Sequence, residues 1–476
     1  MTAGDGVPGN EVTMEATGAA VNADPDAGPA SADRRRVITL GCRLNTYESE
    51  VIRGHLAAAE AECPDGPETV VVNTCAVTAE AERQARQTIR RIKRDRPECR
   101  VVVTGCSAQI DPDRYTAMAE VDHVVGNAEK LRPETWSGMA DAATATQRAL
   151  VNDIGSVRDT AQHLVDGFTD RTRGFVQVQQ GCDHRCTFCI IPYGRGPSRS
   201  VPVAEVVRQI QALVGNGTRE VVLSGVDITS YGGDLPGKPV LGHLVQAVLR
   251  HVPDLPRLRL SSLDCIEVDE ALWDVIANDH RFMPHLHLSL QSGDPMILKR
   301  MKRRHTPDEA VALTERARRI RPDIVFGADL IAGFPTETGE MAANTLAAID
   351  ACGLTWVHVF PYSERPGTPA ARMPQIPGNV RKARAAALRQ AAAAAQQRFL
   401  DSRVGCHEML LIENSGLGRT EQFATARLVD GPAPAGSLIA AVVIGHDDGV
   451  LQTRRAVCGP HGFFSPATPP ETTDVS

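Results

Sequence analysis

Six of the twelve cysteines in this chain fall into two sets of three. The first set is spread widely along the sequence and comprises Cys42, Cys75 and Cys106. The second set is local, in the segment GCDHRCTFC, and comprises Cys182, Cys186 and Cys189. Three thiolates can hold a cubic iron–sulfur cluster and leave one iron free for another ligand. Two such sets in one chain predict a chemical role for the cysteines rather than a structural one.

Each cysteine of the first set directly follows a predicted buried strand. These strands are Val37–Leu40, Val70–Val72 and Val101–Thr104. Because the strands of a parallel sheet end at the same edge, the three cysteines can converge despite the long segments between them. Gly41 and Gly105 allow tight backbone turns beside two of them. A single cysteine of this kind would more often be an inert core residue, but the repeated placement predicts a shared metal site.

The second set follows another predicted strand, Phe175–Gln179, and forms a C-x3-C-x2-C loop after Gly181. A structural zinc ion needs a fourth Cys or His ligand. His184 lies within the loop and could supply it, so zinc is the alternative hypothesis. An iron–sulfur cluster with an open iron fits a set of three ligands better. The remaining cysteines have no comparable setting and are assigned to core or surface: Cys63, Cys99, Cys265, Cys352, Cys406 and Cys458.

The order of predicted elements indicates an α/β protein of three folded regions between two disordered tails, residues 1–34 and 465–476. Residues 35–150 alternate strands with helices and predict a small parallel sheet, with helices at Thr46–Glu60, Ala79–Arg94 and Asp113–Glu120. Residues 168–400 hold six strand–helix units, which predict a partial barrel. Its strands are expected at Phe175–Gln179, Glu220–Ser224, Arg257–Ser262, His285–Leu290, Ile324–Leu330 and Trp356–Phe360. Residues 403–464 predict a small β-barrel.

The composition is that of an ordinary globular protein, with 42% hydrophobic and 23% charged residues. No run of about 18 apolar residues predicts a membrane span. The N-terminus lacks the features of a secretory signal, so we expect a cytoplasmic protein. The formal net charge is −7, yet three runs are basic: Arg90–Arg96, Lys299–His305 and Arg316–Arg321. Each run alone is typical of a solvated helix face, whereas the three together are compatible with a nucleic-acid partner.

The cysteine loop after the first barrel strand resembles that of the radical S-adenosylmethionine (SAM) enzymes. In that superfamily the loop binds a 4Fe–4S cluster whose open iron takes the amino and carboxylate groups of SAM, and reductive cleavage gives a 5′-deoxyadenosyl radical. Phe188 stands at the aromatic position of the loop. The segments GCRLNTYESE, NTCAVT and TGCSAQ are similar to the three upstream cysteine motifs of the methylthiotransferases. Further motifs follow in order: LSGVDITSYG, RLRLSSLDCIEV, HLHLSLQSGDPMILKRMKRRH, GADLIAGFPTET and HVFPYSERPGT.

Within that family, the segment after Cys42 resembles the branch that acts on N6-threonylcarbamoyladenosine in tRNA. Branches acting on isopentenyladenosine in tRNA, or on an aspartate of a ribosomal protein, remain the alternatives. A third possibility is a noncatalytic RNA-binding protein with structural metal. The resemblance covers roughly residues 36 to 450. Asp264 and Cys265 stand where the family commonly has Glu-Pro, and Thr336 stands where Gly is common. The C-terminal barrel resembles the TRAM domain.

The resemblance implies two 4Fe–4S clusters, each held by one cysteine set, so that all six cysteines are expected to be both metal ligands and catalytic residues. SAM would serve as methyl donor and as radical source. Carbon 2 of the modified adenine has a C–H bond that is not acidic, which is why a radical is needed. Expected cofactor-binding residues are Phe188, Gly225, Ser262, Asp264, Gln291 and Gly333. Expected RNA-binding residues are Arg300, Lys302, Arg303 and Arg304.

Further expectations concern the partners and the barrel interior. A tRNA substrate and an electron donor such as a flavodoxin or a ferredoxin are implied, while the sulfur donor is not predicted. In the strand HLHLSLQ, alternation places His285, His287, Ser289 and Gln291 on the face that points into the barrel. These histidines could serve the site or simply be satisfied interior residues.

Overall fold

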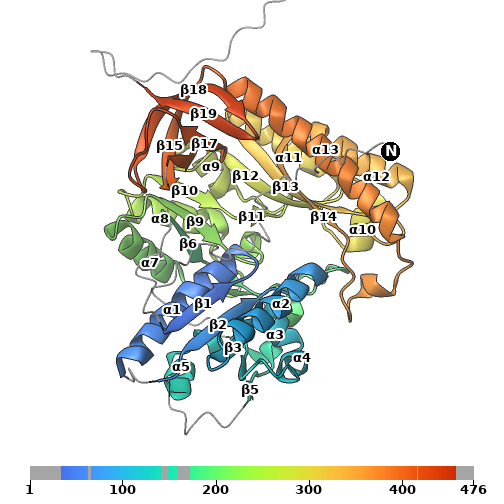
Figure 1. Ribbon diagram of the computed structural model, residues 1–476. Helices are drawn as coiled ribbons and strands as arrows, with labels where there is room; N and C mark the ends of the chain where they lie inside the picture. Colours follow the sequence, from blue (N-terminus) through green and yellow to red (C-terminus); the bar gives the residue numbers. More distant parts are fainter. Residues whose placement is uncertain (1–33, 63–65, 141–147, 159–171, 415, 457–476) are drawn as a thin grey trace, which may run out of the picture.

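The computed structural model describes residues 34–62, 66–140, 148–158, 172–414 and 416–456. Three parts follow one another along the chain (Figure 1): an N-terminal sheet domain, a central partial barrel and a small C-terminal β-barrel. Within the described residues, no helix is long and apolar enough to cross a membrane.

The N-terminal domain is a five-stranded parallel sheet in the order β1-β2-β3-β4-β5. Its strands are β1 (Arg35–Thr39), β2 (Thr69–Thr74), β3 (Arg100–Gly105), β4 (His123–Val125) and β5 (Ala149–Leu150). Its helices are α1 (Arg43–Glu62), α2 (Ala79–Asp95), α3 (Cys106–Ile110), α4 (Pro112–Thr116) and α5 (Pro133–Ala140). Valines on β2 and β3 alternate between two cores, one closed by α1 and α5 and the other by α2. This layering confirms the expected sheet with covering helices.

One expected helix of this domain was wrong in its bounds. The sequence predicted a helix over Asp113–Glu120, whereas α4 spans Pro112–Thr116 and a separate α3 begins at Cys106 itself. Asp111 lies between the two helices and caps α4 by accepting a hydrogen bond from the Arg114 backbone N–H at 3.2 Å. Pro112 suits the first turn of a helix but cannot continue an earlier one, because its ring and missing N–H break the hydrogen-bond ladder.

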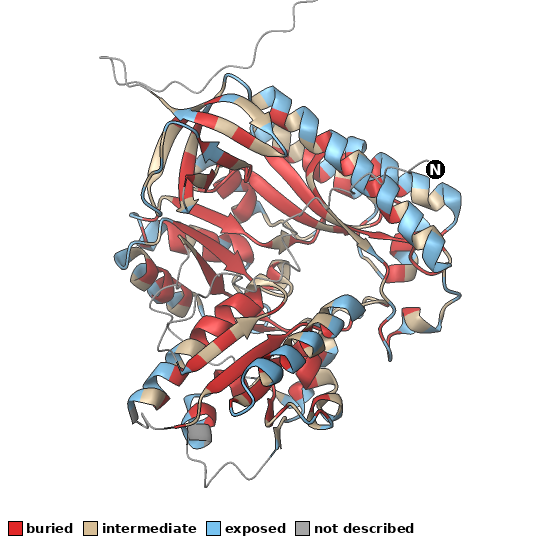
Figure 2. Ribbon diagram, in the orientation of Figure 1, coloured by how far each residue is buried: buried red, intermediate tan, exposed pale blue. Residues whose placement is uncertain are grey.

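The central domain confirms the partial barrel of six parallel strand–helix units (Figure 1). Its strands are β6 (Arg173–Gln177), β9 (Glu220–Ser224), β10 (Arg257–Leu260), β12 (His285–Gln291), β13 (Val325–Ala332) and β14 (Leu354–Pro361). The helices that follow them are α7 (Val203–Gly215), α8 (Leu241–His251), α9 (Glu270–Asn278), α11 (Pro307–Ile320), α12 (Gly339–Ala351) and α13 (Gly378–Arg403). Shorter elements are β7 (Gln179–Gln180), α6 (Ile191–Arg195), β8 (Arg199–Ser200), β11 (Ser262–Leu263) and α10 (Pro295–Met301). Most residues of the barrel strands are buried, although the end of β14 is half-buried or exposed, whereas the helices are exposed on their outer faces (Figure 2).

The C-terminal domain is a closed five-stranded barrel in the order β15-β16-β17-β19-β18. Its strands are β15 (His407–Asn414), β16 (Leu417–Arg419), β17 (Thr425–Leu428), β18 (Leu438–Asp447) and β19 (Val450–Arg455). The loop between β16 and β17 attaches this barrel to the central domain. Arg259 of β10 donates to the carbonyl oxygens of Thr420 and Glu421 at 2.9 and 2.8 Å. Trp356 of β14 donates to the Gln422 carbonyl oxygen at 2.9 Å, so the loop closes one end of the partial barrel.

Candidate active site

The three cysteines of the first set lie at the ends of neighbouring strands, as expected. Cys42 immediately precedes α1, Cys75 follows β2, and Cys106 begins α3 after β3. The chain passes very close beside them. Gly41 has a φ of +103°, and a Cβ there would lie 2.6 Å from the Cys75 Cβ. Gly105 has a φ of +98°, and a Cβ there would overlap the Thr74 carbonyl oxygen. Both positions therefore require glycine to keep the cysteines together.

The environment of these thiols favours a bound cation. Burial, together with the neighbouring Cys42 and Cys106, raises the pKa of the Cys75 thiol to about 12. Burial likewise raises the pKa values of Cys182 and Cys189 to about 12. Thiols with such pKa values remain protonated at neutral pH unless a metal supplies positive charge. A donor set of three mutually close thiols thus fits an iron–sulfur group that converts them to thiolates.

The second set lies in the loop between β7 and α6, at the carboxyl end of the first barrel strand. The loop is fixed by backbone hydrogen bonds from Cys182 to the Gly196 carbonyl and from Cys189 to the Cys186 carbonyl, each 3.1 Å long. Arg303 reaches the loop from the α10–α11 connection, with its Nη1 3.7 Å from the Cys186 Sγ. Arg303 therefore places a positive charge beside this sulfur.

The zinc alternative for this loop required His184 as a fourth ligand. His184 instead directs its Nε2 at the Asp227 carboxylate, 2.9 Å away. Asp227 also accepts hydrogen bonds from the Ser230 and Thr229 hydroxyls at 2.7 and 3.0 Å. Among the described residues, the groups whose donor atoms lie within 4.8 Å of one another combine histidines with carboxylates and include neither cysteine set. Tetrahedral zinc with Zn–S bonds of about 2.3 Å would hold its sulfurs about 3.8 Å apart, so the thiol positions favour a wider metal group.

The two cysteine sets lie next to each other across the domain boundary. Ile190, directly after Cys189, packs on Ala76 and Cys106. A Cβ added to Gly194 would lie 3.3 Å from the Cys106 Cβ, and the Gly194 carbonyl accepts a 2.6 Å hydrogen bond from Asn127, whose amide also points at the Cys106 sulfur. The helix that follows the second set is therefore packed directly on the end of β3.

A buried charge network holds this arrangement. Glu48 of α1 accepts hydrogen bonds from Arg195, at the end of α6, and from Lys130, at 2.6 Å. All three side chains are buried. Burial alone would raise the pKa of Glu48, but Arg195 and Lys130 lower it below its usual range. Burial alone would lower the pKa of the Arg195 guanidinium, but the nearby Cys106, Glu48 and Cys42 raise it above its usual range. Sequence reasoning missed Glu48, Lys130 and Arg195.

The residues expected to bind SAM gather at the carboxyl ends of the barrel strands. Gly225 follows β9, where the Val226 and Asp227 amides donate to the Gln179 side chain at 3.0 and 2.9 Å. Ser262 begins β11, and Gln291 ends β12 with a φ of +68°. Gly333 follows β13 with a φ of +71°. Phe188 packs edge-on against Phe334, with ring centroids 6.4 Å apart. Their roles toward SAM stay predictions.

Asp264, expected near a ribose, is 5% exposed and lies 2.8 Å from Arg303 and 3.5 Å from Arg304. Burial would raise its pKa, but His305, Arg303 and Arg304 lower it below the usual range of a carboxyl group. Thr336, which replaces the family's common glycine, adopts a φ of +67°. Glycine adopts that conformation freely and a β-branched residue does so at a cost.

The four residues expected to bind RNA have different surroundings. Lys302 is exposed at the end of α10 in a left-handed conformation. Arg304 is about one-third exposed and pairs with Glu267. Arg300 donates to the Thr336 carbonyl oxygen at 3.2 Å. Arg303 is largely buried between Asp264 and Cys186. Lys302 and Arg304 thus remain available to an external partner, whereas Arg303 is oriented toward the cysteine loop.

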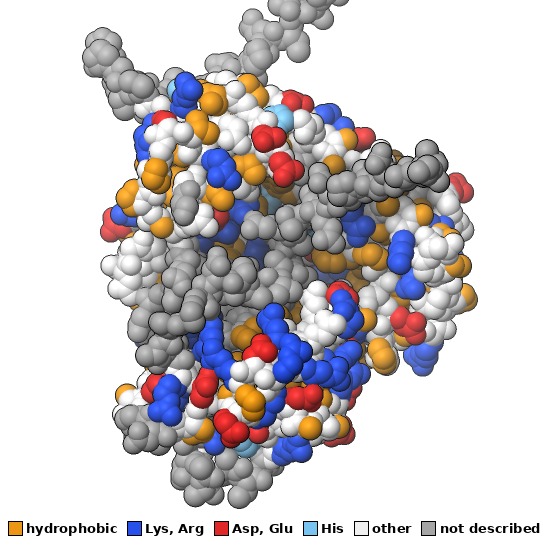
Figure 3. All heavy atoms as spheres, viewed as in Figure 1, with side chains coloured by type: hydrophobic (Ala, Val, Ile, Leu, Met, Phe, Trp, Pro, Cys, Tyr) orange, Lys and Arg blue, Asp and Glu red, His pale blue; other side chains and the backbone are white. Residues whose placement is uncertain are grey.

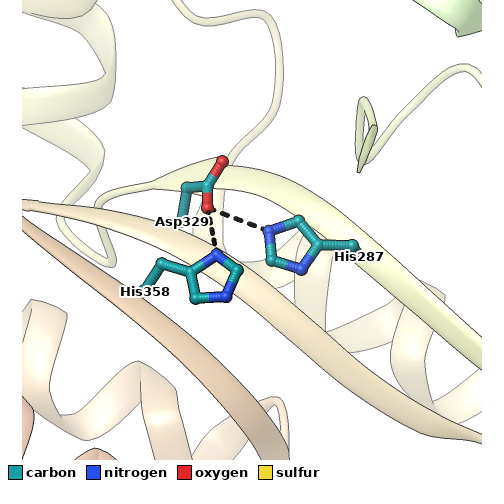
Figure 4. Close-up of side chains that lie close together, drawn as sticks. All are labelled: His287, Asp329 and His358. Atoms are coloured by element: carbon teal, nitrogen blue, oxygen red, sulfur yellow. Dashed lines mark hydrogen bonds and ion pairs between the residues drawn. The ribbon is translucent and has the colours of Figure 1, made fainter. Parts of the chain in front are cut away.

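A further polar group lies within the partial barrel (Figure 4). Asp329 of β13 accepts hydrogen bonds from His287 Nε2 at 2.9 Å and from His358 Nδ1 at 3.0 Å. The two imidazoles stack at 4.8 Å, and His285 stacks on Phe423 at 5.1 Å. The inward direction of His285 and His287 was expected. Asp329 and His358 were missed, although the same two-residue alternation on β13 and β14 would have revealed them.

Comparisons with known proteins agree with this geometry. Residues 176–349 match the Radical SAM superfamily, and residues 34–126 match the family described as Uncharacterized protein family UPF0004. A radical SAM methyltransferase from Kitasatospora setae, TsrM, has a similar fold, with a TM-score of 0.50, 17% identity and coverage of 71% of this chain and 77% of that one. The partial barrel with its cysteine loop therefore defines a radical SAM enzyme.

Proteins with similar sequences identify the family within the radical SAM enzymes. The chain is 49% identical over 419 residues to the threonylcarbamoyladenosine tRNA methylthiotransferase MtaB of Rickettsia prowazekii (strain Madrid E), covering 88% of this chain and 97% of that protein. It is 32% identical to the MtaB of Aquifex aeolicus (strain VF5), covering 85% and 98%. It is 34% identical to a tRNA-2-methylthio-N(6)-dimethylallyladenosine synthase of Maricaulis maris (strain MCS10), covering 85% and 93%. The chain belongs to the threonylcarbamoyladenosine tRNA methylthiotransferase family, whose radical SAM membership implies SAM and a 4Fe–4S cluster.

Proposed function

We propose that this enzyme attaches a methylthio group to carbon 2 of N6-threonylcarbamoyladenosine in tRNA, with two 4Fe–4S clusters and SAM. The observation that carries the proposal is the direct packing of the two cysteine sets, through Ile190 and Gly194 on Cys106. Two reactive centres must reach one carbon atom, so their ligands must lie side by side. The 49% identity to a relative of that name supports the substrate.

The two cysteine sets have different proposed roles, which follow from their positions. Cys182, Cys186 and Cys189 lie at the carboxyl ends of the barrel strands, where the expected SAM residues gather. Cys42, Cys75 and Cys106 lie after the carboxyl ends of β1, β2 and β3 in the adjoining sheet domain. When bound, the clusters and SAM supply a carbon radical and a source of sulfur. The protein orients both and places positive charge beside the cysteines, with Arg303 beside Cys186 and Arg195 near Cys106 and Cys42.

The tRNA is proposed to bind across the N-terminal domain and the barrel. Figure 3 shows Lys and Arg side chains gathered on the N-terminal domain where it faces a hollow. Helix α2 and its C-cap residue contribute exposed arginines to the basic run predicted from sequence: Arg90, Arg91, Arg94 and the C-cap Arg96. Lys302, Arg304 and Arg300 would add contacts from the barrel side, and the C-terminal barrel would provide a further RNA surface. We propose that the reaction takes place in the cytoplasm with a flavodoxin or ferredoxin as electron donor.

The test is anaerobic reconstitution followed by modification of tRNA that carries threonylcarbamoyladenosine. Mass spectrometry of the digested nucleosides should reveal the methylthio product. Iron per chain should fall from about eight to about four when either cysteine set is replaced by alanine, because each set holds one cluster of four irons. Replacing the first set should abolish methylthiolation while SAM cleavage persists.

Two results would contradict the proposal. Product formed only on tRNA that carries dimethylallyladenosine would move the enzyme to the activity named for the Maricaulis maris relative. A reconstituted protein with about four irons per chain, unaffected by replacement of Cys42, Cys75 and Cys106, would remove the second cluster. As a control, tRNA from cells lacking the threonylcarbamoyl group should give no product.

A further inference from the structure

Four arginines from all three domains surround one aromatic ring, Phe423. Their guanidinium carbons lie 6.0, 5.4, 5.2 and 4.7 Å from the ring centroid for Arg43, Arg173, Arg259 and Arg419 respectively. Phe423 belongs to the loop between β16 and β17 and has a φ of +72°. Its other neighbour is His285, which stacks on the ring inside the partial barrel. The ring stabilises these cations and brings them to one place.

Arg43 differs from the other three in its pairing. Arg173 and Arg419 share Glu413, at 2.6 and 3.3 Å, and Arg259 pairs with Glu220 at 2.8 Å. Among the described residues, no carboxylate oxygen lies within 4.0 Å of the Arg43 guanidinium, and its carbon lies 6.0 Å from the centroid of the Phe423 ring. Desolvated cations without a counter-ion are costly, so this position favours an incoming anion.

The side chains near Arg43 line an internal space. Asp329, midway along β13, retains 28% side-chain exposure. His358 retains 16%, and Arg43 itself is only half-buried. Because these side chains lie inside the partial barrel and remain reachable by water, they border open space in its interior. The interior also holds the Phe423 ring, His285 and His287, and Arg43 lies beside the ring.

The charge of this lining selects an anion over a metal cation. His287, Asp329 and His358 are close enough together to hold a metal ion. The surrounding guanidiniums disfavour it, because each like charge raises the cost of a further cation. Burial and Arg259 lower the pKa of His285 well below its usual range, and burial lowers that of His358. Both imidazoles are therefore neutral at neutral pH and leave the positive charge to the arginines.

We propose that Arg43 and the lumen beside Phe423, His285 and Asp329 form the pocket for the threonyl carboxylate of the substrate. The inference rests on the proposed function, since the threonylcarbamoyl group carries a carboxylate and a hydroxyl whereas a dimethylallyl group carries neither. The position of Arg43 beside the first cysteine set fits this role. Arg43 follows Cys42 directly, with Cα atoms about 3.8 Å apart, so a nucleobase at the first cysteine set would direct its N6 substituent toward this pocket. The neutral imidazoles and Asp329 would form hydrogen bonds with the threonyl hydroxyl.

The experiment compares two tRNA substrates that differ only at the carboxylate: threonylcarbamoyladenosine and its threoninamide analogue. The native enzyme should prefer the acid by about 10- to 100-fold in kcat/KM, the worth of one charge-assisted hydrogen bond. Arg43→Gln should reduce this preference to within about threefold, and Arg43→Lys should retain part of it. Arg316→Gln is a matched control, because Arg316 also lies over an aromatic ring, Trp273, but on the outer surface. It should keep the full preference.

The comparison of the acid and amide substrates can be made with the native enzyme alone, so it remains informative if the Arg43→Gln protein does not fold. Equal rates on acid and amide by the native enzyme would overturn the pocket. So would an Arg43→Gln enzyme that is slowed equally on both substrates. If the native enzyme modifies neither substrate but does modify dimethylallyladenosine tRNA, the proposed function fails, and that outcome is distinct from loss of carboxylate preference.

Discussion

Glu48 and Arg195 form a buried bidentate ion pair that joins the N-terminal sheet domain to the barrel, with N–O distances of 2.7 and 3.1 Å. Glu48 lies on the helix that follows Cys42, and Arg195 lies at the end of the helix that follows Cys189. Arg195 also donates to Asn45 at 2.8 Å, and Asn45 donates to the Leu40 carbonyl oxygen at 2.6 Å. One carboxylate therefore sets the position of both cysteine sets.

Replacing this carboxylate should damage both sites at once. Glu48→Gln leaves the guanidinium of Arg195 and the ammonium of Lys130 buried without a counter-ion. Removing one partner of a buried pair costs about 3 to 5 kcal/mol. The free energy of unfolding, measured by urea denaturation under anaerobic conditions, should fall by that amount, and iron per chain should decrease. Glu80→Gln is the control, because Glu80 pairs with Arg83 on the exposed face of α2. Its effect should stay within about 1 kcal/mol, and equal effects of the two changes would contradict the role of Glu48.

Gly105→Ala should displace Cys106 and destabilise the protein. The added methyl would overlap the Thr74 carbonyl oxygen in a left-handed conformation, and such strain costs about 1 to 3 kcal/mol before any clash. The melting temperature of the protein and its iron content per chain should both decrease. Gly54→Ala provides the opposite case, because Gly54 is exposed within α1 and a Cβ there meets nothing within 4 Å. It should stabilise the protein by about 0.5 to 1 kcal/mol. A Gly105→Ala protein with native melting temperature and native iron content would contradict this prediction, because it would show that the sheet edge tolerates movement.

The cysteine positions were predictable because strand ends and local loops follow from short-range patterns. Val70–Val72 and Val101–Thr104 read as buried strands, and the cysteines after them had to meet at one edge. Glu48 and Lys130 were not predictable, since a charged residue on a helix normally faces solvent. Only the packing of two domains buries them. Phe423 gave no signal either, because its role arises where three domains meet.

The basic run Lys299–His305 shows the same limit. Four of its residues were expected to bind RNA, namely Arg300, Lys302, Arg303 and Arg304, but the order of charged residues does not reveal which side chains turn inward. The end of α10 at Lys302, in a left-handed conformation, directs the following residues in different directions. Arg303 enters the protein and reaches Asp264, whereas Arg304 stays partly exposed.

The pH dependence of stability should contain a contribution from His285. Burial and the cations Arg259 and Arg43, with His287 and His358 nearby, lower its pKa in the folded protein. The unfolded chain binds a proton near pH 6.5 and the folded chain does not, so stability falls as pH drops below about 6.5. Relative to His285→Gln, the native protein should lose up to about 1.4 kcal/mol between pH 7.5 and 5.5. Urea unfolding of both proteins at the two pH values measures this difference. Identical pH slopes would contradict a neutral His285.

The binding of tRNA should separate Lys302 and Arg304 from Arg303. An exposed cation that neutralises a phosphate adds about 0.7 to 0.9 to the slope of log K against log salt concentration. Lys302→Ala and Arg304→Gln should each reduce the slope by about that amount in filter binding at several salt concentrations. Arg398→Gln, at an exposed pair with Asp350, should leave it unchanged. Arg303→Gln should leave the slope near its native value and instead lower iron content, because Arg303 is directed at Asp264 and Cys186. A slope reduced by Arg303→Gln but not by Lys302→Ala would reverse the assignment and place the RNA backbone deeper in the barrel mouth.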